Sequence, residues 1–307
     1  MDREVYNGNQ RKKVKGIILA GGSGTRLYPI TRATSKQLVN VYDKPLIYYP
    51  LCTLMEMHIK QILVVTTPED LPNISRLLGS GRQWGISLTY AVQDEPRGIA
   101  DGLIIAKYFT EYDPCIMILG DNIFMGPWMN TINVDIIRAL QDDKAAIVCT
   151  HVKNPEAFGV LTNTTIEIGG HTQSEQCIVE KPEIPGSNWA VTGLYAYPSG
   201  AWFEAEKLKP SDRGELEITD LNNIYLTKYT DGMKVLYLHK YTRWMDVGTV
   251  ENLSKAGMMI RRAQKRSVTP LFSPEEVAVR LQFIKPEEVQ KNLIGDNAYI
   301  RRLKKTI

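Results

Sequence analysis

The sequence lacks the features that mark secreted or membrane-bound proteins. Its 307 residues include only four cysteines (Cys52, Cys115, Cys149 and Cys177), widely spaced and with no Cys-x-x-Cys pair. This pattern predicts free, mostly buried thiols in a reducing compartment rather than a disulfide framework. No run of about 18 apolar residues could cross a bilayer, and the polar N-terminus has no apolar signal-peptide region. We therefore expect a cytoplasmic protein that does not contact a membrane.

The chain also has little excess of charge of either sign, with 37 lysines and arginines against 34 aspartates and glutamates. The net charge is only +3, and much of this excess lies in 11–13 and in 301–305. We interpret these as solvated tails, which argues against a nucleic-acid-binding surface. Internal repeats and low-complexity segments are absent. With 43% hydrophobic residues the chain can bury a sizeable core, and we expect residues 1–13 to form a disordered N-terminal extension.

Apolar runs alternate with helical patterns through the first half of the chain. The predicted strands are 16–19, 61–66, 88–92, 115–119 and 145–152, and the predicted helices between them are 45–57, 69–78 and 99–108. This order predicts an α/β fold with a Rossmann-like, mainly parallel sheet flanked by helices. In such sheets ligands bind at the carboxyl ends of the strands, where the loops after Leu19, Val92 and Leu119 lie.

The second half is richer in short strands. We expect antiparallel strands at 159–161, 165–168 and 177–180, with a turn at Gly169-Gly170, followed by helices at 216–229 and 252–264. Helix-start patterns follow Pro270. The predicted organisation is one domain over 14–265 that contains a β-rich insertion at about 150–245, and a small helical segment over 266–307.

A glycine-rich loop follows the first buried strand. Gly21, Gly22, Gly24 and Thr25 carry little side chain, so backbone N–H groups can approach a polyphosphate closely. Arg26 and, ten residues on, Lys36 add cations suited to phosphate oxygens. The spacing fits neither the dinucleotide pattern G-x-G-x-x-G nor the P-loop. From these residues alone, a tight turn with a surface arginine remains the alternative.

Two aspartates follow apolar stretches at predicted strand ends. Asp121 comes after the run 116–119 and a glycine, and Asp246 comes between Trp244-Met245 and Val247-Gly248. Two carboxylates together with nucleotide oxygens form a normal Mg²⁺ shell. The alternative for each is a turn or helix-capping aspartate.

An ordered set of motifs resembles the sugar nucleotidyltransferase family, also called sugar-nucleotide pyrophosphorylases. The resemblance covers about residues 14–300, through the segments 19–29 with 35–37, 41–45, 119–122, 180–182, 190–195, 213–220, 244–249 and 273–276. It implies Mg²⁺-dependent transfer of a nucleotidyl group from dTTP to glucose 1-phosphate, which yields dTDP-glucose and pyrophosphate. UTP or another sugar 1-phosphate is the alternative pair of substrates.

The resemblance also implies residue roles. Asp121 and Asp246 match the family's metal ligands, whereas Arg26, Lys36 and Lys181 match the cations that hold the nucleotide and sugar phosphates. The positions matched to nucleotide binding are Leu19, Gly21, Gly22, Gly24, Thr25, Gln37, Gln93 and Gly98. Those matched to sugar binding are Asn122, Gly159, Glu180, Val191 and Gly193, with Val191 and Gly193 alternatively plain residues of a core strand.

Individual side chains suggest how such substrates are recognised. The Gln93 amide offers a donor and an acceptor to the imide edge of thymine or uracil, and the Glu180 carboxylate can accept from vicinal sugar hydroxyls. Asp101 and Gly102 stand where the family commonly has Gln and Ala, Phe158 where a tyrosine is common, and Arg243 where a small residue is common. These departures leave the identity of the sugar open.

The C-terminal segment resembles the family's assembly and regulatory part. By that resemblance we expect a homotetramer that is inhibited by an end-product nucleotide sugar. Two other classes remain as alternatives: a non-catalytic subunit that binds nucleotide sugars, and a Rossmann oxidoreductase, which the glycine spacing disfavours.

Overall fold

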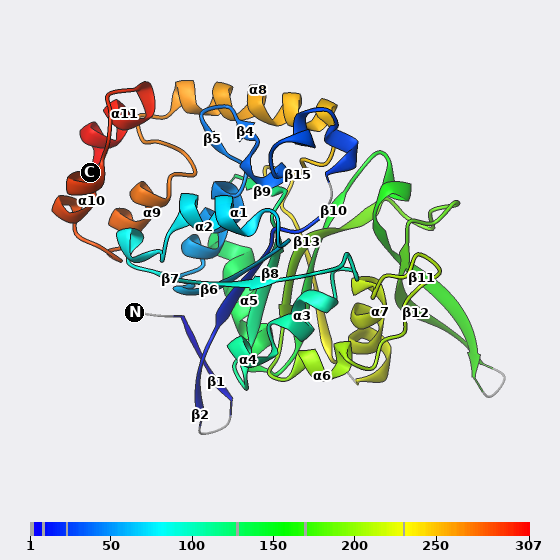
Figure 1. The fold of residues 1–307 in the computed structure, drawn as a ribbon. Helices are drawn as coiled ribbons and strands as arrows, with labels where there is room; N and C mark the ends of the chain where they lie inside the picture. Colours follow the sequence, from blue (N-terminus) through cyan, green and yellow to red (C-terminus); the bar gives the residue numbers. More distant parts are fainter. Residues whose placement is uncertain (1–2, 8–9, 23, 127–128, 169–170, 230) are drawn as a thin grey trace.

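The computed structural model describes residues 3–7, 10–22, 24–126, 129–168, 171–229 and 231–307. A nine-stranded mixed sheet runs through its centre (Figure 1). Along the main path the strand order is β12-β11-β13-β8-β3-β6-β7, and β10 pairs with both β13 and β14. The central strands β8, β3, β6 and β7 are parallel, whereas β13 runs antiparallel to β8 and β10. The expected parallel centre is confirmed.

The strands of this sheet are β3 (Lys15–Leu19), β6 (Gln61–Thr66), β7 (Ser87–Val92), β8 (Cys115–Leu119), β10 (Ala145–His151), β11 (Gly159–Ile168), β12 (His171–Glu180), β13 (Trp189–Tyr197) and β14 (Met233–Tyr237). Three small ladders pair β1 (Glu4–Asn7) with β2 (Gln10–Lys13), β4 (Asn40–Val41) with β5 (Lys44–Pro45), and β9 (Asn122–Met125) with β15 (Arg243–Asp246). The α-helices are α1 (Tyr48–Glu56), α2 (Leu71–Leu78), α3 (Asp101–Ile105), α4 (Lys107–Thr110), α5 (Met129–Gln141), α6 (Ala201–Ala205), α7 (Ile218–Asn223), α8 (Val250–Arg266), α9 (Pro274–Arg280), α10 (Pro286–Asn292) and α11 (Ala298–Thr306).

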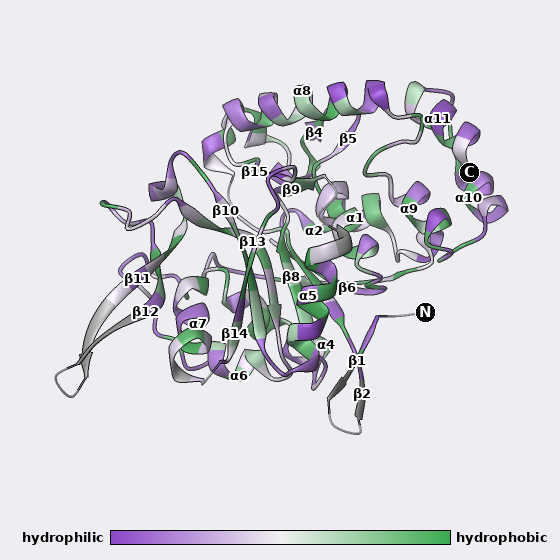
Figure 2. Cartoon of the chain, turned by 180° about the vertical axis from the view of Figure 1, so that it is seen from behind, coloured by the Kyte–Doolittle hydropathy of each residue, from purple (hydrophilic) through white to green (hydrophobic). Residues whose placement is uncertain are grey.

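Helices cover both faces of the sheet because successive strand residues point to opposite sides. In β3, Ile18 packs into the cluster formed with α1, α2, α5 and α9, whereas Ile17 packs into the cluster formed with α3, α6 and α7. Both are fully buried, so the central strands read as continuous apolar runs. The apolar strands at the centre of the sheet are visible in Figure 2.

The N-terminal region differs from the expected disordered extension. Strands β1 and β2 form an antiparallel hairpin, and the N–H of Arg3 donates to the carbonyl of His58 at 3.0 Å. Val5 is fully buried in the main core. An apolar side chain among polar neighbours therefore anchors a segment that its composition had suggested was unstructured.

The second half also differs from the predicted short elements. Residues 159–168 and 171–180 pair along their whole length as one long hairpin, and the predicted Gly169-Gly170 turn lies outside the described residues. The predicted helix 216–229 is a short α-helix, α7, followed by a π-helical turn over Ile224–Lys228. In the C-terminal part, α8 lies across the top of the view in Figure 1 and leads into α9, α10 and α11.

The small helix α9 begins as the sequence predicts. The Ser273 hydroxyl accepts from the N–H of Glu276, and Pro274 occupies the first helical position. Within the described ranges, none of the helices combines the length and apolarity needed to cross a bilayer.

Candidate active site

A cavity of about 740 Å³ opens at the carboxyl ends of the central strands. It is bounded on one side by the glycine-rich loop after β3 and on the other by β11, β13 and the segment before α7. The candidate residues that line it are Leu19, Gly21, Gly22, Thr25, Arg26, Gln37, Gln93, Gly98, Asp121, Asn122, Gly159, Glu180, Lys181, Val191, Gly193 and Asp246. Two others, Gly24 and Lys36, are not part of this lining.

Both exceptions still lie next to the cavity. Gly24 adopts φ 60° before the short 3₁₀ turn of Thr25–Leu27, and its carbonyl accepts from the Thr31 hydroxyl at 2.8 Å. Such a positive φ favours glycine. The Lys36 ammonium is hydrogen-bonded to the carboxylate of Asp121, which does line the cavity. The structure thus gathers the phosphate-loop and metal candidates around one opening.

The two candidate metal ligands converge from distant parts of the chain. Asp121 lies between β8 and β9, Asp246 ends β15, and β15 pairs with β9 so that Asp246 stands opposite Asn122. The N–H of Val247 donates to the carbonyl of Asp121 at 2.9 Å, and the Asn252 amide donates to the carbonyl of Asp246 at 2.8 Å. These bonds hold both backbones where the carboxylates meet.

The two carboxyl groups titrate differently because their partners differ. Burial and the nearby charge of Asp121 raise the pKa of Asp246 to about 6. Burial alone would raise the pKa of Asp121 too, but the charge and hydrogen bond of Lys36 keep that pKa below its ordinary value. The ionised form of Asp246 is therefore the less stabilised of the two carboxylates, and an added positive charge would stabilise it.

Arg26 lies beside that carboxylate. A Cβ atom at Gly248 would lie 2.7 Å from Arg26 Nη2 and 2.9 Å from Asp246 Oδ1. The guanidinium and the carboxylate therefore both pack against this glycine, where a larger residue would not fit. Arg26 itself is exposed at the mouth of the cavity. A guanidinium in this position can bind a phosphate group of a ligand in the cavity.

Asn122 holds the inner wall of the cavity together. Its Oδ1 accepts from the N–H of Gly193 at 3.0 Å and from the Trp244 indole, and its Nδ2 donates to Asp121 at 2.8 Å. A Cβ on Gly193 would lie 2.6 Å from the same Oδ1. Gly193 is therefore both a residue of core strand β13 and a residue that the Asn122 contact requires to be small.

The opposite wall contains a charged network around Glu180. Its Oε2 accepts from the Thr219 hydroxyl at 2.6 Å, and its Oε1 lies 3.3 Å from the Lys181 ammonium and 3.5 Å from the Arg213 guanidinium. Arg213 also donates to both oxygens of Glu217 at 2.9 Å. The orientation of the Glu180 carboxylate is thus fixed before any ligand arrives.

Several cavity residues received no role from the sequence. They include Arg213, Glu217, Thr219, Asn222 and Trp244. For Arg213, Glu217 and Thr219 the available signal was the motif over 213–220, and for Trp244 it was the motif over 244–249; Asn222 lies in neither motif. Phe158, one of the departures, packs edge-on against Trp244 with ring centroids 5.1 Å apart.

The two glutamines lie at the base of the glycine-rich loop. Gln37 Nε2 donates to the carbonyl of Gly21 at 3.4 Å, and the Ser35 hydroxyl donates to Gln37 Oε1 at 2.9 Å. Gln93 Nε2 donates to the carbonyl of Gly98 at 3.1 Å and to Asp101 Oδ2 at 2.8 Å. The sequence suggested that Gln93 turns both a donor and an acceptor toward a base, but its two hydrogens are already used and only Oε1 remains.

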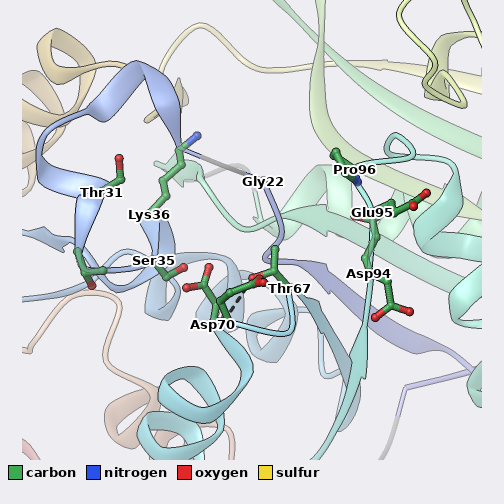
Figure 3. A pocket seen from close by; sticks show the side chains of 12 residues that line it. Gly22, Thr31, Ser35, Lys36, Thr67, Asp70, Asp94, Glu95 and Pro96 are labelled. Carbon is green, nitrogen blue, oxygen red and sulfur yellow. Dashed lines mark hydrogen bonds between the residues drawn. The ribbon is translucent and has the colours of Figure 1, made fainter.

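A second hollow of about 350 Å³ adjoins the first and shares Gly22, Gln93 and Pro96 with it (Figure 3). Hydroxyl and carboxylate groups line it, from Thr31, Thr34, Ser35, Thr67, Glu69, Asp70, Asp94 and Glu95, together with Lys36. It extends the polar surface around the glycine-rich loop.

A divalent cation fits the acidic pair only with help from a ligand. In the part of the chain that the structure describes, no three His, Cys, Asp or Glu side chains cluster as a metal site. Asp121 and Asp246 supply two carboxylates, and Mg²⁺ typically keeps waters and substrate phosphates as its other ligands. The donor set therefore suits Mg²⁺ bound together with a nucleotide.

Comparison with known proteins places this architecture in a family. Residues 15–263 match the nucleotidyl transferase family. A glucose-1-phosphate thymidylyltransferase of Neisseria meningitidis is 45% identical over 300 residues, which cover 95% of this chain and 100% of the relative. One from Mycobacterium tuberculosis is 43% identical over 276 residues, 90% of this chain and 92% of the relative.

A solved structure shares the fold as well as the sequence. It is a candidate glucose-1-phosphate thymidylyltransferase from Bacillus anthracis in complex with sucrose, with a TM-score of 0.70 and 39% identity over 80% of this chain and 94% of that one. A UDP-glucose pyrophosphorylase bound to UDP-glucose, 22% identical, has the same fold with a TM-score of 0.67 over 81% of this chain and 99% of that one. From its sequence and its fold alike, this chain belongs to the nucleotidyl transferase family.

Proposed function

We propose that this protein is a glucose-1-phosphate thymidylyltransferase, which converts dTTP and glucose 1-phosphate into dTDP-glucose and pyrophosphate with Mg²⁺. The observation that carries the proposal is the convergence of Asp121 and Asp246, from distant parts of the chain, beside Arg26 in one cavity. The relatives named for this activity are 43% to 45% identical to the chain over at least 90% of its length. The family and the site therefore point to the same reaction.

The proposed reaction needs alignment and charge neutralisation more than proton transfer. A phosphate oxygen of glucose 1-phosphate attacks the α-phosphorus of dTTP in line, and the bond from that phosphorus to the β-phosphate oxygen breaks. The attacking oxygen is already anionic near neutral pH, so no general base is required. Mg²⁺ held by Asp121 and Asp246 would neutralise charge on the nucleotide phosphates.

The cations of the cavity have separate tasks in this proposal. Arg26 binds the leaving pyrophosphate, and Lys36, paired with Asp121, supports the nucleotide phosphates. Lys181, beside Glu180 at the far wall, holds the phosphate of the sugar. Each contact is strengthened where water is excluded, and fixed groups of this kind give a large share of many rate enhancements.

Glu180 reads the sugar in the same arrangement. Thr219 donates to its Oε2 at 2.6 Å, which leaves lone pairs on both oxygens for sugar hydroxyls. Gly159 and Gly193 line the cavity without a side chain, and Val191 lines it with an apolar one. Base recognition falls to Gln93, Gly98 and Gln37.

The proposal also covers the assembly, regulation and location of the protein. We expect a homotetramer, with an end-product nucleotide sugar as feedback inhibitor, and a cytoplasmic location in keeping with four free cysteines. The solution mass and inhibition by nucleotide sugars test these expectations. The results of these tests do not depend on which reaction the cavity catalyses.

A substrate panel tests the reaction itself. Pyrophosphate release is measured with dTTP or UTP against glucose 1-phosphate and other sugar 1-phosphates, with EDTA as the metal-free control. We expect the highest kcat/KM for dTTP with glucose 1-phosphate and no release in EDTA. A preference for UTP or for another sugar would establish the alternative substrate pair, which the departures at Asp101 and Phe158 leave open. Absence of turnover with every pair would instead favour a non-catalytic nucleotide-sugar-binding subunit.

A further inference from the structure

We infer that Asp101 is a positioning residue that fixes which end of the Gln93 amide faces the nucleotide base, and thereby makes the site select an imide base over cytosine. The inference rests on the proposed function, because only there is Gln93 assigned to the base. Asp101 is one of the departures from the family pattern noted in the sequence. Its side chain is only 2% exposed, yet it is charged and lies at the first residue of α3.

The contacts of Asp101 decide the orientation of Gln93. Arg97 Nη2 lies 3.1 Å from Asp101 Oδ1, and Gln93 Nε2 donates to Asp101 Oδ2 at 2.8 Å. The same Nε2 donates to the carbonyl oxygen of Gly98 at 3.1 Å. Both acceptors, a carboxylate paired with an arginine and a backbone carbonyl, have no hydrogen to give. The reversed amide would place Oε1 against two oxygens, so only one orientation is stable.

This orientation leaves Gln93 with a single function toward a ligand. An amide nitrogen carries two hydrogens, and both are used. Gln93 Oε1 lies next to Gly21 in the cavity, 3.3 Å from the position of a Cβ on that glycine. No donor within the described ranges bonds to this oxygen. Gln93 therefore presents an acceptor and no donor.

An acceptor at this point distinguishes bases by the group at N3. Thymine and uracil carry a hydrogen on N3 and can donate it to Oε1. Cytosine carries a lone pair on N3, so it would face Oε1 with two acceptors and no hydrogen between them. A site built to hydrogen-bond a substrate N–H rejects analogues that lack it by up to about 10⁴–10⁵-fold. The same acceptor does not separate dTTP from UTP.

The isosteric variant Asp101→Asn tests the role. Its Oδ1 can stay with Arg97 while its Nδ2 faces Gln93, and a donor there lets the Gln93 amide reverse and turn Nε2 into the cavity. Because Gly98 still favours the original orientation, we expect both to be populated. The ratio of kcat/KM for dTTP over dCTP should fall at least about 10-fold, which corresponds to about 1.4 kcal/mol. The change should appear mainly in the nucleotide KM, with UTP following dTTP.

The matched control is Asp94→Asn, which removes an exposed carboxylate from the same loop. It should keep the wild-type ratio. A folded Asp101→Asn protein with the wild-type dTTP-to-dCTP ratio overturns the inference. Where that variant does not fold, 3-methyl-dTTP, which has no N3 hydrogen, is tested on the wild-type enzyme. A loss of less than about 10-fold relative to dTTP likewise overturns it.

Failure of the role assigned to Asp101 can be told apart from failure of the proposed function. If the wild-type protein releases no pyrophosphate with any substrate pair, the proposed function fails while the base preference is still measured. Binding of dTTP, UTP and dCTP by calorimetry then gives the comparison between the wild type and Asp101→Asn. Equal affinity of the wild type for dTTP and dCTP would refute the role of Asp101 in either case.

Discussion

Replacement of Asp246 by asparagine should stabilise the metal-free protein while it abolishes the proposed activity. Burial and the charge of Asp121 raise the Asp246 pKa from 3.8 to about 6. A carboxyl group whose pKa is higher in the folded than in the unfolded state favours folding when protonated, and this contribution is lost as the pH rises from about 4 through about 6. At about 1.4 kcal/mol per pH unit, the ionised group costs the folded state up to about 3 kcal/mol at pH 7.5.

The asparagine variant removes this cost. Its amide has nearly the same shape and can donate to Asp121, so the repulsion between two carboxylates becomes a hydrogen bond. In EDTA at pH 7.5 we expect its free energy of unfolding to exceed that of the wild type by about 2–3 kcal/mol, and the advantage to shrink toward pH 4.5. Without this carboxylate the site should no longer bind Mg²⁺ productively, and pyrophosphate release should fall at least about 10²-fold.

Urea denaturation in EDTA across this pH range measures the stability, and pyrophosphate release with Mg²⁺ measures the activity. Asp142→Asn, an exposed carboxylate after α5, is the control and should change stability by less than about 0.5 kcal/mol. If the Asp246→Asn protein were less stable than the wild type at pH 7.5 in EDTA, the account of the carboxylate pair would be wrong. If it kept near-normal turnover, the assignment of Asp246 to the metal would be wrong.

Three further changes probe one cation of the cavity, one glycine with positive φ and one helix cap. Arg26→Ala should lower kcat about 10²–10³-fold in the pyrophosphate assay and lower Tm only slightly, because the exposed Arg26 side chain contributes positive charge beside Asp246 and little to the core. Gly98→Ala should lower Tm by more than Gly200→Ala: both residues have positive φ, but a Cβ on Gly98 would lie 2.4 Å from the carbonyl oxygen of Leu216, whereas one on Gly200 meets nothing within 4 Å. Thr249→Ala removes the side-chain cap that accepts from the Asn252 N–H and should cost about 1 kcal/mol in urea denaturation; an unchanged midpoint would mean that the cap is replaced by water.

The half of the cavity next to the glycine-rich loop could be predicted from sequence for a geometric reason. Central strands buried on both faces read as apolar runs, and β6 and β8 have the predicted bounds. Parallel neighbours end at one edge of the sheet, so polar residues after them were expected to meet. Asp121, Gln93 and the loop after Leu19 do line one cavity.

The opposite half could not be predicted this way. Antiparallel strands β11, β12 and β13 bring their polar residues to the cavity through register, and register depends on pairings between residues far apart in the chain. Arg213 and Thr219 contact Glu180, a partner more than thirty positions away in the chain, and Glu217 is linked to it only through Arg213. Only the order of the family motifs pointed to this wall, and that order carried no information about which side chains hold one another.

Asp101 and Gln93 show what structure adds where the sequence pattern had already identified the relevant residue. The amide of Gln93 has two possible orientations, and sequence alone leaves it with both a donor and an acceptor. Three contacts, from Arg97 to Asp101 and from Gln93 to Asp101 and Gly98, remove one of them. If Gln93 binds the base as we propose, specificity toward that base depends on a buried carboxylate that does not touch the ligand. A substitution at Asp101 would then change selectivity through hydrogen-bond direction alone, because it decides which polar atom of Gln93 remains for the substrate.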